Sequence, residues 1–171
     1  QINFRVLLCY DEKNDDIFKY INIIKKFKFK TVLINNPKKG PCNAVIAGLK
    51  YSKIQCKIVY PADDFLNYKL IDKMYNLFLD GNDIVVPSRF IKGGSMKNCP
   101  LLKSIFVRLA SSTLFYLSSI PVKDASNGFR LFSQKLLSKV KIESRVGFAY
   151  SLELLAKCNR LKMRIAEMPA R

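Results

Sequence analysis

The chain has 171 residues, of which 49% are hydrophobic, and a formal net charge of +17. This length is enough for one domain with a sizeable core and too short for two comfortable ones. The absence of histidine excludes Ser-His-Asp and Cys-His relays and the usual histidine-containing metal sites. A metal ion would therefore be a hard cation bound by oxygen, and a general base would be a carboxylate.

The positive charge predicts an anionic partner: nucleic acid, an acidic membrane surface or a phosphate-bearing substrate. A solvated basic surface is the alternative interpretation. The five cysteines include no CxxC pair, which argues against a disulfide framework or a thiolate zinc site and suits a reducing compartment. The chain begins abruptly at Gln1 and stops at Arg171 without a tail, so we expect a piece of a longer protein.

Apolar runs alternate with helical periods along the whole chain. Strands are predicted over residues 4–9, 31–34, 57–60 and 83–86, and helices over 14–27, 41–51, 67–79 and 100–118. Because the strands are continuous apolar runs, they predict a mostly parallel sheet covered by helices on both faces. Ligands bind such sheets beyond the carboxyl ends of the strands. Three polar clusters occupy those positions: Asp11, Asp63 with Asp64, and Ser88 with Arg89.

The apolar segment 101–122 needs a separate test for membrane insertion. Lys103 and Arg108 interrupt it, and the neutral stretch 109–122 is shorter than the ~20 residues of a spanning helix. We therefore predict a buried or half-buried helix. An interfacial helix, with its basic residues facing lipid head groups, is the alternative.

Asp63 and Asp64 follow the third strand directly. Two neighbouring carboxylates repel each other, so a cation or strong hydrogen-bond donors should lie nearby if both are ionised. A Mg²⁺ or Mn²⁺ ion bridging to a substrate diphosphate would satisfy this requirement. A turn, in which aspartate is common, explains the pair equally well.

Two further loops carry groups that could bind phosphate. Residues 89–94 combine Arg89 and Lys92 with two glycines, whose backbone N–H groups can approach an anion closely. Residues 124–130 combine a carboxylate with glycine and arginine, which could place a base and a phosphate ligand on one loop. The alternatives are a flexible loop for the first segment and a turn leading into a strand for the second.

Taken in order, these segments resemble motifs of family 2 glycosyltransferases, and within them of the dolichol-phosphate mannosyltransferase and polyprenyl-phosphate glycosyltransferase branch. The resemblance lies in residues 10–15 (YDEKND), 40–48 (GPCNAVIAG), 88–94 (SRFIKGG), 99–103 (CPLLK) with Arg108, 124–130 (DASNGFR), 148–155 with Glu153, and 165–169 (IAEMP). Residues 88–94 and 124–130 carry most of the weight.

The resemblance implies a GT-A fold, which is a Rossmann-like α/β three-layer sandwich with a mostly parallel central sheet. It implies a single catalytic domain over residues 1–171, truncated at both ends and lacking the family's first strand. The implied reaction is inverting transfer of a sugar from a UDP- or GDP-linked donor to a polyprenyl or dolichyl phosphate or a related membrane-borne acceptor. Such an enzyme would work at the cytosolic face of a membrane, through peripheral contact and without nucleic acid.

The resemblance also assigns residues to the donor and the metal. Donor binding is expected of Asp11, Gly40, Asn43, Asp63 and Arg89, with Asp11 contacting the nucleotide base. Asp63 and Asp64 are the expected ligands of Mg²⁺ or Mn²⁺. The family's D-x-D motif aligns with residues 61–63, so Pro61 replaces the first aspartate and Asp64 is an added neighbour.

On the acceptor side, the resemblance assigns phosphate binding to Arg108 and Arg130, with Lys103 as a weaker third cation, and catalysis to Asp124 and Arg89. A phosphorylated acceptor is already an anion at neutral pH and needs no general base. If the acceptor is a hydroxyl group, Asp124 is the expected base.

Three other functions stay open at this point. The chain could be a catalytically impaired relative of these transferases, because Pro61 replaces a metal ligand. A nucleotidyltransferase would need a glycine- and arginine-rich loop after the first strand, where residues 11–14 are acidic and lack glycine. A basic nucleic-acid-binding domain would interleave basic residues with exposed aromatic residues on one face, whereas the lysines here are spread along the chain.

Overall fold

The computed structural model describes residues 3–96, 100–117 and 120–171, with the backbone alone at Leu101 and Lys103. The chain forms two compact units. The first contains Gln1–Lys53 and Ser144–Ala149, and the second contains Ile54–Glu143 and Tyr150–Arg171. The single domain predicted over residues 1–171 therefore stays a prediction.

The first unit is built on a pair of parallel strands, β1 (Arg5–Tyr10) and β2 (Lys30–Asn35). Helix α2 (Pro41–Lys50) packs on β1, and a Cβ atom added at Gly48 would lie only 3.3 Å from the Cys9 sulfur. The helix predicted over residues 14–27 is shorter than expected. It consists of a 3₁₀ turn, η1 (Asp16–Tyr20), followed by a single α-helical turn, α1 (Ile21–Ile24).

The sequence explains both limits of this short helix. The Asp15 carboxylate accepts a hydrogen bond from the Ile17 backbone N–H at 3.0 Å, which fixes the start of the 3₁₀ turn. After Ile24 the chain reads KKFKFK, in which lysine and phenylalanine alternate instead of continuing the helical period. That period-2 pattern leads directly into β2.

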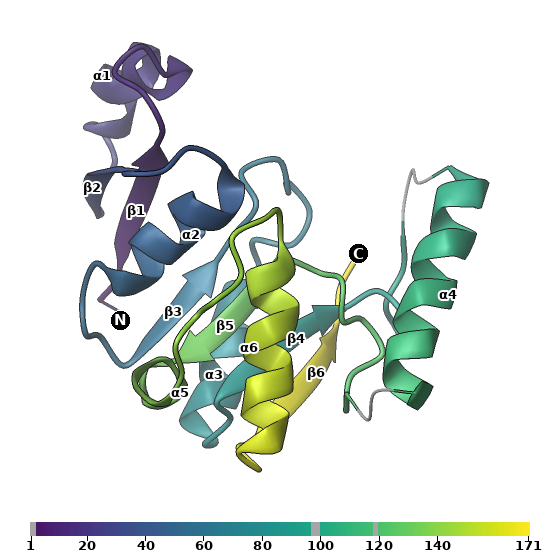
Figure 1. Ribbon diagram of the computed structural model, residues 1–171. Coiled ribbons are helices and arrows are strands. Elements are labelled where there is room, and N and C mark those ends of the chain that lie inside the picture. Colours follow the sequence, from purple (N-terminus) through teal and green to yellow (C-terminus); the bar gives the residue numbers. More distant parts are fainter. Residues whose placement is uncertain (1–2, 97–99, 118–119) are drawn as a thin grey trace. The chain divides into compact units, whose positions relative to one another are not determined.

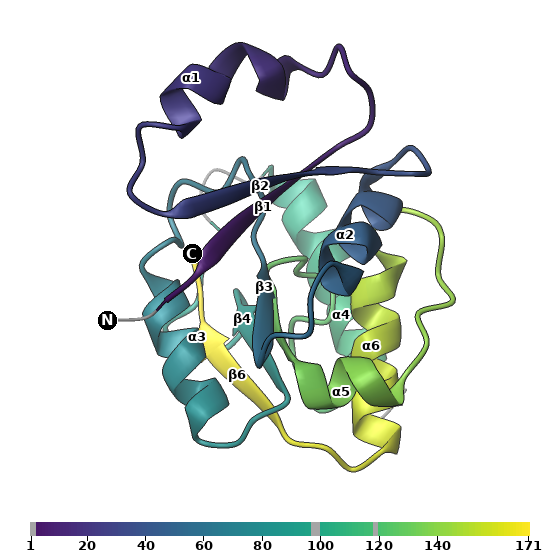
Figure 2. The same cartoon turned by 90° about the vertical axis from the view of Figure 1, so that its left-hand side faces the viewer.

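The second unit contains a four-stranded mixed sheet in the order β3-β5-β4-β6. Strand β5 runs antiparallel to both β3 and β4, whereas β4 and β6 are parallel. Helices α3 (Leu70–Leu79) and α6 (Ala149–Arg160) cover opposite faces of this sheet, as the two views agree (Figures 1 and 2). The four strands are β3 (Cys56–Val59), β4 (Ile84–Ser88), β5 (Arg130–Ser133) and β6 (Ile165–Pro169).

The core of the second unit lies under α3, on the strands at the centre of the sheet. All residues of β4 and β5 are buried, because helices cover both faces. Met74 of α3 packs there with Val85, Phe129, Leu131 and Met168. The predicted α/β class is confirmed, with an antiparallel strand inserted between β3 and β4.

Helix α4 (Leu101–Leu117) confirms the helix predicted over residues 100–118 and lies to one side of the sheet in Figure 1. Ser111 faces inward and is 1% exposed, whereas one stripe of large apolar side chains is open to solvent. Within the described residues, no helix combines the length and apolar character needed to cross a membrane. The exposed stripe contains Leu102, Ile105, Phe106, Leu109 and Tyr116.

Candidate functional site

In the first unit, Asp11 organises the polar end of the parallel strands. Its carboxylate accepts hydrogen bonds from the Gly40 backbone N–H at 2.9 Å and from Asn36 Nδ2 at 2.7 Å. These two bonds, the first being the stronger cause, lower the pKa of Asp11 below its usual value. Asn36 is itself buried, and its backbone N–H donates to the Tyr10 carbonyl at 2.8 Å. Asp11 is therefore an ionised group with a fixed orientation.

The same bonds set the start of α2. Gly40 adopts a φ of +104°, a conformation that L residues other than glycine rarely adopt, and the helix begins at Pro41. Asn43 Nδ2 donates to the Lys39 carbonyl at 3.1 Å in the first turn. The three donor-side residues predicted in this unit thus gather at one end of β1 and α2: Asp11, Gly40 and Asn43.

In the second unit, the two neighbouring aspartates after β3 have different environments. Asp64 Oδ1 accepts from the backbone N–H groups of Leu66 and Asn67 at 3.0 and 2.9 Å, and Oδ2 accepts from Asn67 Nδ2 at 2.8 Å. Asp63 is exposed, and none of the described residues donates to its carboxylate. The Asp64 side chain is therefore committed to its own turn, whereas the Asp63 carboxylate is available to a ligand.

This arrangement limits how a metal ion could bind. Among the described residues, no group of three or more aspartate, glutamate or cysteine side chains converges on a common point. One free carboxylate fits a Mg²⁺ or Mn²⁺ ion only where diphosphate oxygens and water complete the shell. The residues present therefore fit an ion that binds together with a nucleotide.

A buried ion pair, formed by Arg89 and Asp124, follows strand β4. Arg89 Nε donates to Asp124 Oδ2 at 2.7 Å, and a terminal guanidinium nitrogen donates to Oδ1 at 2.8 Å. The Asp124 side chain has no exposed surface, and the Ser126 hydroxyl donates to it at 3.1 Å. Glu167 of β6 accepts from the backbone N–H of Asp124 at 3.1 Å. With these two parallel hydrogen bonds, the Asp124 carboxylate fixes the orientation of the Arg89 guanidinium. The role of Asp124 as a base stays a prediction.

Arg130 lies in the interior of the second unit. Its side chain is completely buried, and its guanidinium donates to the carbonyl oxygens of Ser151 at 2.7 Å and Ala125 at 2.5 Å. Burial lowers the pKa of Arg130 to about 10, which leaves it charged at neutral pH. In this arrangement Arg130 links the loop after Asp124 to helix α6 and has no exposed surface, so its contact with an acceptor phosphate stays a prediction.

The loop after β4 turns back sharply, and its second glycine is required for that path. A Cβ atom at Gly94 would lie 2.4 Å from the Ser88 carbonyl oxygen, which no side chain can occupy. Gly93 has a φ of +89°. The neighbouring Lys92 is exposed, so the loop still presents a cation to solvent, as the sequence predicts.

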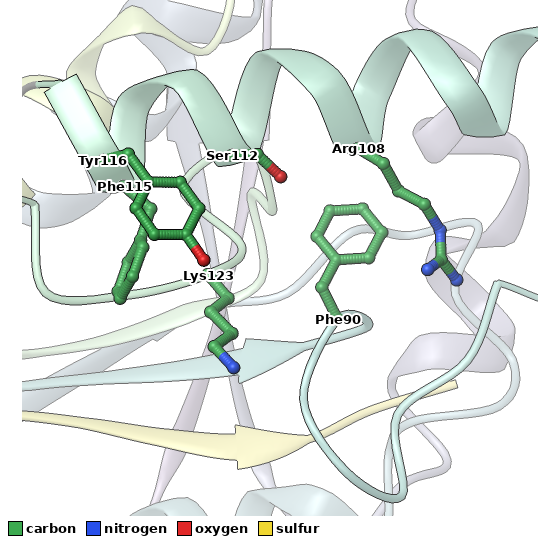
Figure 3. Close-up of a pocket in the computed structure, with 6 residues that line it drawn as sticks. All are labelled: Phe90, Arg108, Ser112, Phe115, Tyr116 and Lys123. Carbon is green, nitrogen blue, oxygen red and sulfur yellow. The ribbon is translucent and has the colours of Figure 1, made fainter.

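A pocket of about 190 Å³ opens between α4 and this loop (Figure 3). The Phe90 ring lies under α4 with the Arg108 guanidinium 5.3 Å from its centroid, and the Arg89 guanidinium lies at the same distance. Lys123 adds a second exposed cation to the wall. The side chain of Lys103, the third predicted phosphate ligand, and Cys99 of the neighbouring motif lie outside the described residues. The pocket is lined by Phe90, Arg108, Ser112, Phe115, Tyr116 and Lys123.

Comparison with known proteins identifies the family. Residues 1–141 match the family model described as glycosyl transferase family 2. The chain belongs to glycosyltransferase family 2. Two of its curated relatives are a dolichol-phosphate mannosyltransferase of Pyrococcus furiosus, 25% identical over 98% of this chain, and the poly(ribitol-phosphate) beta-N-acetylglucosaminyltransferase TarP of Staphylococcus aureus, 24% identical over 80%. The chain covers 47% and 42% of their lengths, so it spans about half of each.

Solved structures confirm the GT-A fold. The glucosyl-3-phosphoglycerate synthase of Mycobacterium tuberculosis, in complex with Mn²⁺, UDP-glucose and phosphoglyceric acid, superposes with a TM-score of 0.68. The alignment covers 94% of this chain and 56% of that one at 15% identity. This likeness establishes the architecture of the glycosyltransferase and leaves its substrates to be argued from its own residues.

Several residues at the glycosyltransferase site are not evident from the sequence. Lys123 precedes a motif residue and looks like one lysine among many, and Phe90 lies inside a motif that assigned it no role. Glu167 lies in a motif that assigns it no role, yet it accepts from the backbone N–H groups of both Lys123 and Asp124. Asn36 has the sequence context of a turn. Its position directly after the strand end could have marked it as a partner of Asp11.

Proposed function

We propose that this family 2 protein transfers a sugar from a nucleotide-sugar donor to a phosphorylated polyprenyl or related membrane-borne acceptor. The observation that carries the proposal is the pocket between α4 and the loop after β4. It combines two exposed cations, Arg108 and Lys123, with aromatic walls formed by Phe90, Phe115 and Tyr116. A phosphate joined to a hydrocarbon chain has the matching chemistry.

On the donor side, Asp11, Gly40 and Asn43 would contact the nucleoside, and Asp63 would contact the diphosphate through Mg²⁺ or Mn²⁺. When bound, that ion would stabilise negative charge on the departing diphosphate. Arg89 would face the same charge with its orientation already set by Asp124. The mycobacterial synthase forms a complex with Mn²⁺ and UDP-glucose, which supports this donor class. A comparison of UDP- and GDP-linked sugars as donors would determine which nucleotide the protein uses.

On the acceptor side, the phosphate would lie between Arg108 and Lys123. Because it is already an anion, the reaction needs no side chain to remove a proton. The relative named dolichol-phosphate mannosyltransferase supports a lipid phosphate as the acceptor class. Of the predicted set of Arg108, Arg130 and Lys103, the proposed acceptor site keeps Arg108 and adds Lys123, and the side chain of Lys103 lies outside the described residues.

The exposed stripe of α4 would meet the membrane that carries the acceptor. Large apolar side chains in contact with the interfacial region, next to basic side chains, are typical of helices that lie on a bilayer surface. The net charge of +17 would favour an anionic leaflet by about 1 kcal/mol for each lysine or arginine near the surface. The proposed reaction would then take place at the cytosolic face of a membrane.

The experiment combines polyprenyl phosphate vesicles, the full-length protein and UDP- or GDP-linked sugars, each with and without Mn²⁺. We expect transfer from one nucleotide class, and Arg108→Ala should raise the acceptor KM about tenfold, equivalent to about 1.4 kcal/mol. Arg160→Ala is the matched control, because Arg160 is an exposed arginine at the end of α6. No transfer by folded protein would support an impaired relative, and equal effects of the two variants would remove the pocket from the proposal.

A further inference from the structure

The last five residues of the second unit contact three loops at once. We call residues 167–171 the β6 anchor. Glu167 accepts a hydrogen bond from the backbone N–H of Asp124. Ala170 donates to the carbonyl of Ser88, the last residue of β4, and accepts from the Ser95 N–H in the loop after it, at 2.8 Å each. The third contact is the amide side chain of Asn67. Because residues 167–169 pair with β4, the first part of the anchor belongs to the sheet, and residues 170–171 continue directly from it.

Asn67 uses both ends of its amide to join the anchor to the aspartate turn. Its Oδ1 accepts from the Arg171 backbone N–H at 2.9 Å, and its Nδ2 donates to the Arg171 carbonyl at 2.5 Å. The same nitrogen donates to Asp64 Oδ2 at 2.8 Å. Asn67 is 8% exposed, and its partner on the anchor lies 104 residues away in the sequence. Only a short amide can accept from one backbone group and donate to both a carbonyl and a carboxylate at this position.

These bonds form a chain from the sheet to the free carboxylate. Asp64, held by Asn67, accepts from two backbone N–H groups of its own turn, and the Tyr60 hydroxyl donates to the Asp64 carbonyl. Asp63 has no partner of its own among the described residues, so its position depends on the turn that carries it. A carboxylate on an ordered turn loses less conformational entropy on binding a ligand than one on a loose turn.

We propose that Asn67 is a positioning residue. It holds the Asp63 turn against the β6 anchor and thereby sets the metal-dependent affinity for the nucleoside diphosphate. This role rests on the proposed function, because it assumes that Asp63 meets the metal-bound diphosphate. Through the shared anchor, the turn of Asp63 and the loop of Asp124 are held by one strand end.

The first arm of the test needs no ligand. In the full-length protein, Asn67→Ala should speed amide hydrogen exchange at Leu66, Asn67 and Arg171 about tenfold, because their acceptors are lost or released. The matched control is Asn82→Ala: Asn82 is also 8% exposed and its Nδ2 donates to the Leu77 carbonyl at 2.7 Å, away from the turn. Unchanged exchange at the three amides, or the same change in the control, would overturn the proposal.

The second arm titrates UDP and GDP into the protein at a series of Mn²⁺ concentrations. Asn67→Ala should raise the Mn²⁺ concentration for half-maximal nucleotide binding about tenfold, while binding in chelator stays the same. Asn67→Asp is isosteric and places a second carboxylate beside Asp64, so it should raise this Mn²⁺ concentration further. It replaces the alanine variant in the experiment if that variant does not fold. An equal loss of binding with and without metal would overturn the role of Asn67. If the wild type binds the nucleotide equally well without metal, the metal is removed from the proposed function, and the role of Asn67 in metal-dependent binding is removed with it. The hydrogen-exchange arm is independent of the metal, so it shows whether the Asn67 proposal fails by itself.

Discussion

Arg108 and Arg130 are the same residue type and have the same predicted task, but the structure gives them opposite environments. Arg108 is exposed on α4 above the Phe90 ring, with its guanidinium open to the pocket. Arg130 has no exposed surface and donates to backbone carbonyls. A sequence motif marks the position of an arginine but does not show whether its side chain is buried. An exposed arginine can bind a ligand, whereas a buried one supports the surrounding loop.

The difference has an energetic cause. Removing a guanidinium from water costs several kcal/mol, which the hydrogen bonds of Arg130 and the nearby Asp124 charge must offset. An exposed arginine has no such cost and keeps its donors for a ligand. The same contrast separates the two carboxylates of the second unit, because Asp124 is buried and paired whereas Asp63 is exposed and free of partners among the described residues.

The largest effect is expected for Arg130→Met. Loss of the guanidinium leaves the Ser151 and Ala125 carbonyls without their donor and removes a positive charge near Asp124, which keeps its ion pair with Arg89. We therefore expect a loss of about 3 kcal/mol in the free energy of unfolding. Urea denaturation measures this directly. A variant with unchanged stability and a raised acceptor KM would reverse the comparison and return Arg130 to the phosphate site.

The two carboxylates provide the second prediction. Asp124→Asn should lower the free energy of unfolding by about 2 kcal/mol, because it removes the charge that pairs with the partly buried Arg89. Asp63→Ala should change it by less than about 0.5 kcal/mol and instead remove metal-dependent nucleotide binding. Denaturation and calorimetric titration of both variants test this. Similar stability losses in the two would show that the Asp63 turn also has a structural role.

Lys123→Gln tests an exposed cation that is proposed to bind the acceptor. Because Lys123 is exposed, the substitution should leave unfolding within about 0.5 kcal/mol of the wild type and raise the acceptor KM about fivefold. The salt dependence of that KM should also weaken, since one cation is lost. Kinetics at two ionic strengths measure both effects, and an unchanged KM would exclude Lys123 from the acceptor site.

The smallest effect concerns Asp11 and its pH dependence. The pKa of Asp11 is lowered in the folded protein, so the carboxylate stabilises the fold above its usual pKa of 3.8, and this contribution is lost as the pH falls through the lowered value. Thermal unfolding of Asp11→Asn and the wild type should therefore differ by a constant amount at about pH 5–7. The two should converge in strong acid. A constant difference down to the lowest pH would mean that the carboxylate charge is not the cause.

Much of the fold follows from the sequence, but strand direction does not. Continuous apolar runs report that both faces of a strand are buried, and β5 has this property whether it runs parallel or antiparallel. The helix predicted over residues 14–27 failed because its last third has a strand-like alternation of lysine and phenylalanine. The α/β class depends only on the order of elements and was predicted correctly.

The sequence marked candidate site residues where chemistry and motif coincide, and it gave no mark to residues whose contacts are with distant backbone. The motifs assigned both Arg89 and Asp124 to catalysis, and the structure joins them in one ion pair. The sequence did not identify Asn67 as a candidate residue. Its partner is the backbone of Arg171, and every residue type has the same backbone groups, so a contact of this kind cannot be predicted from residue identities. Arg130 shows the reverse case, in which a motif residue proved to be internal.

Two guanidinium groups lie 5.3 Å from the centroid of the Phe90 ring, and their pairing determines the charge of the pocket. Asp124 neutralises Arg89, so the net charge of the pocket lining comes from Arg108 and Lys123. Two positive charges match a phosphate monoester, which carries between about −1.5 and −2 at pH 7. A phosphodiester carries a single negative charge and would leave one cation uncompensated. If the proposed acceptor binds here, its charge alone would favour a terminal phosphate over one inside a polymer.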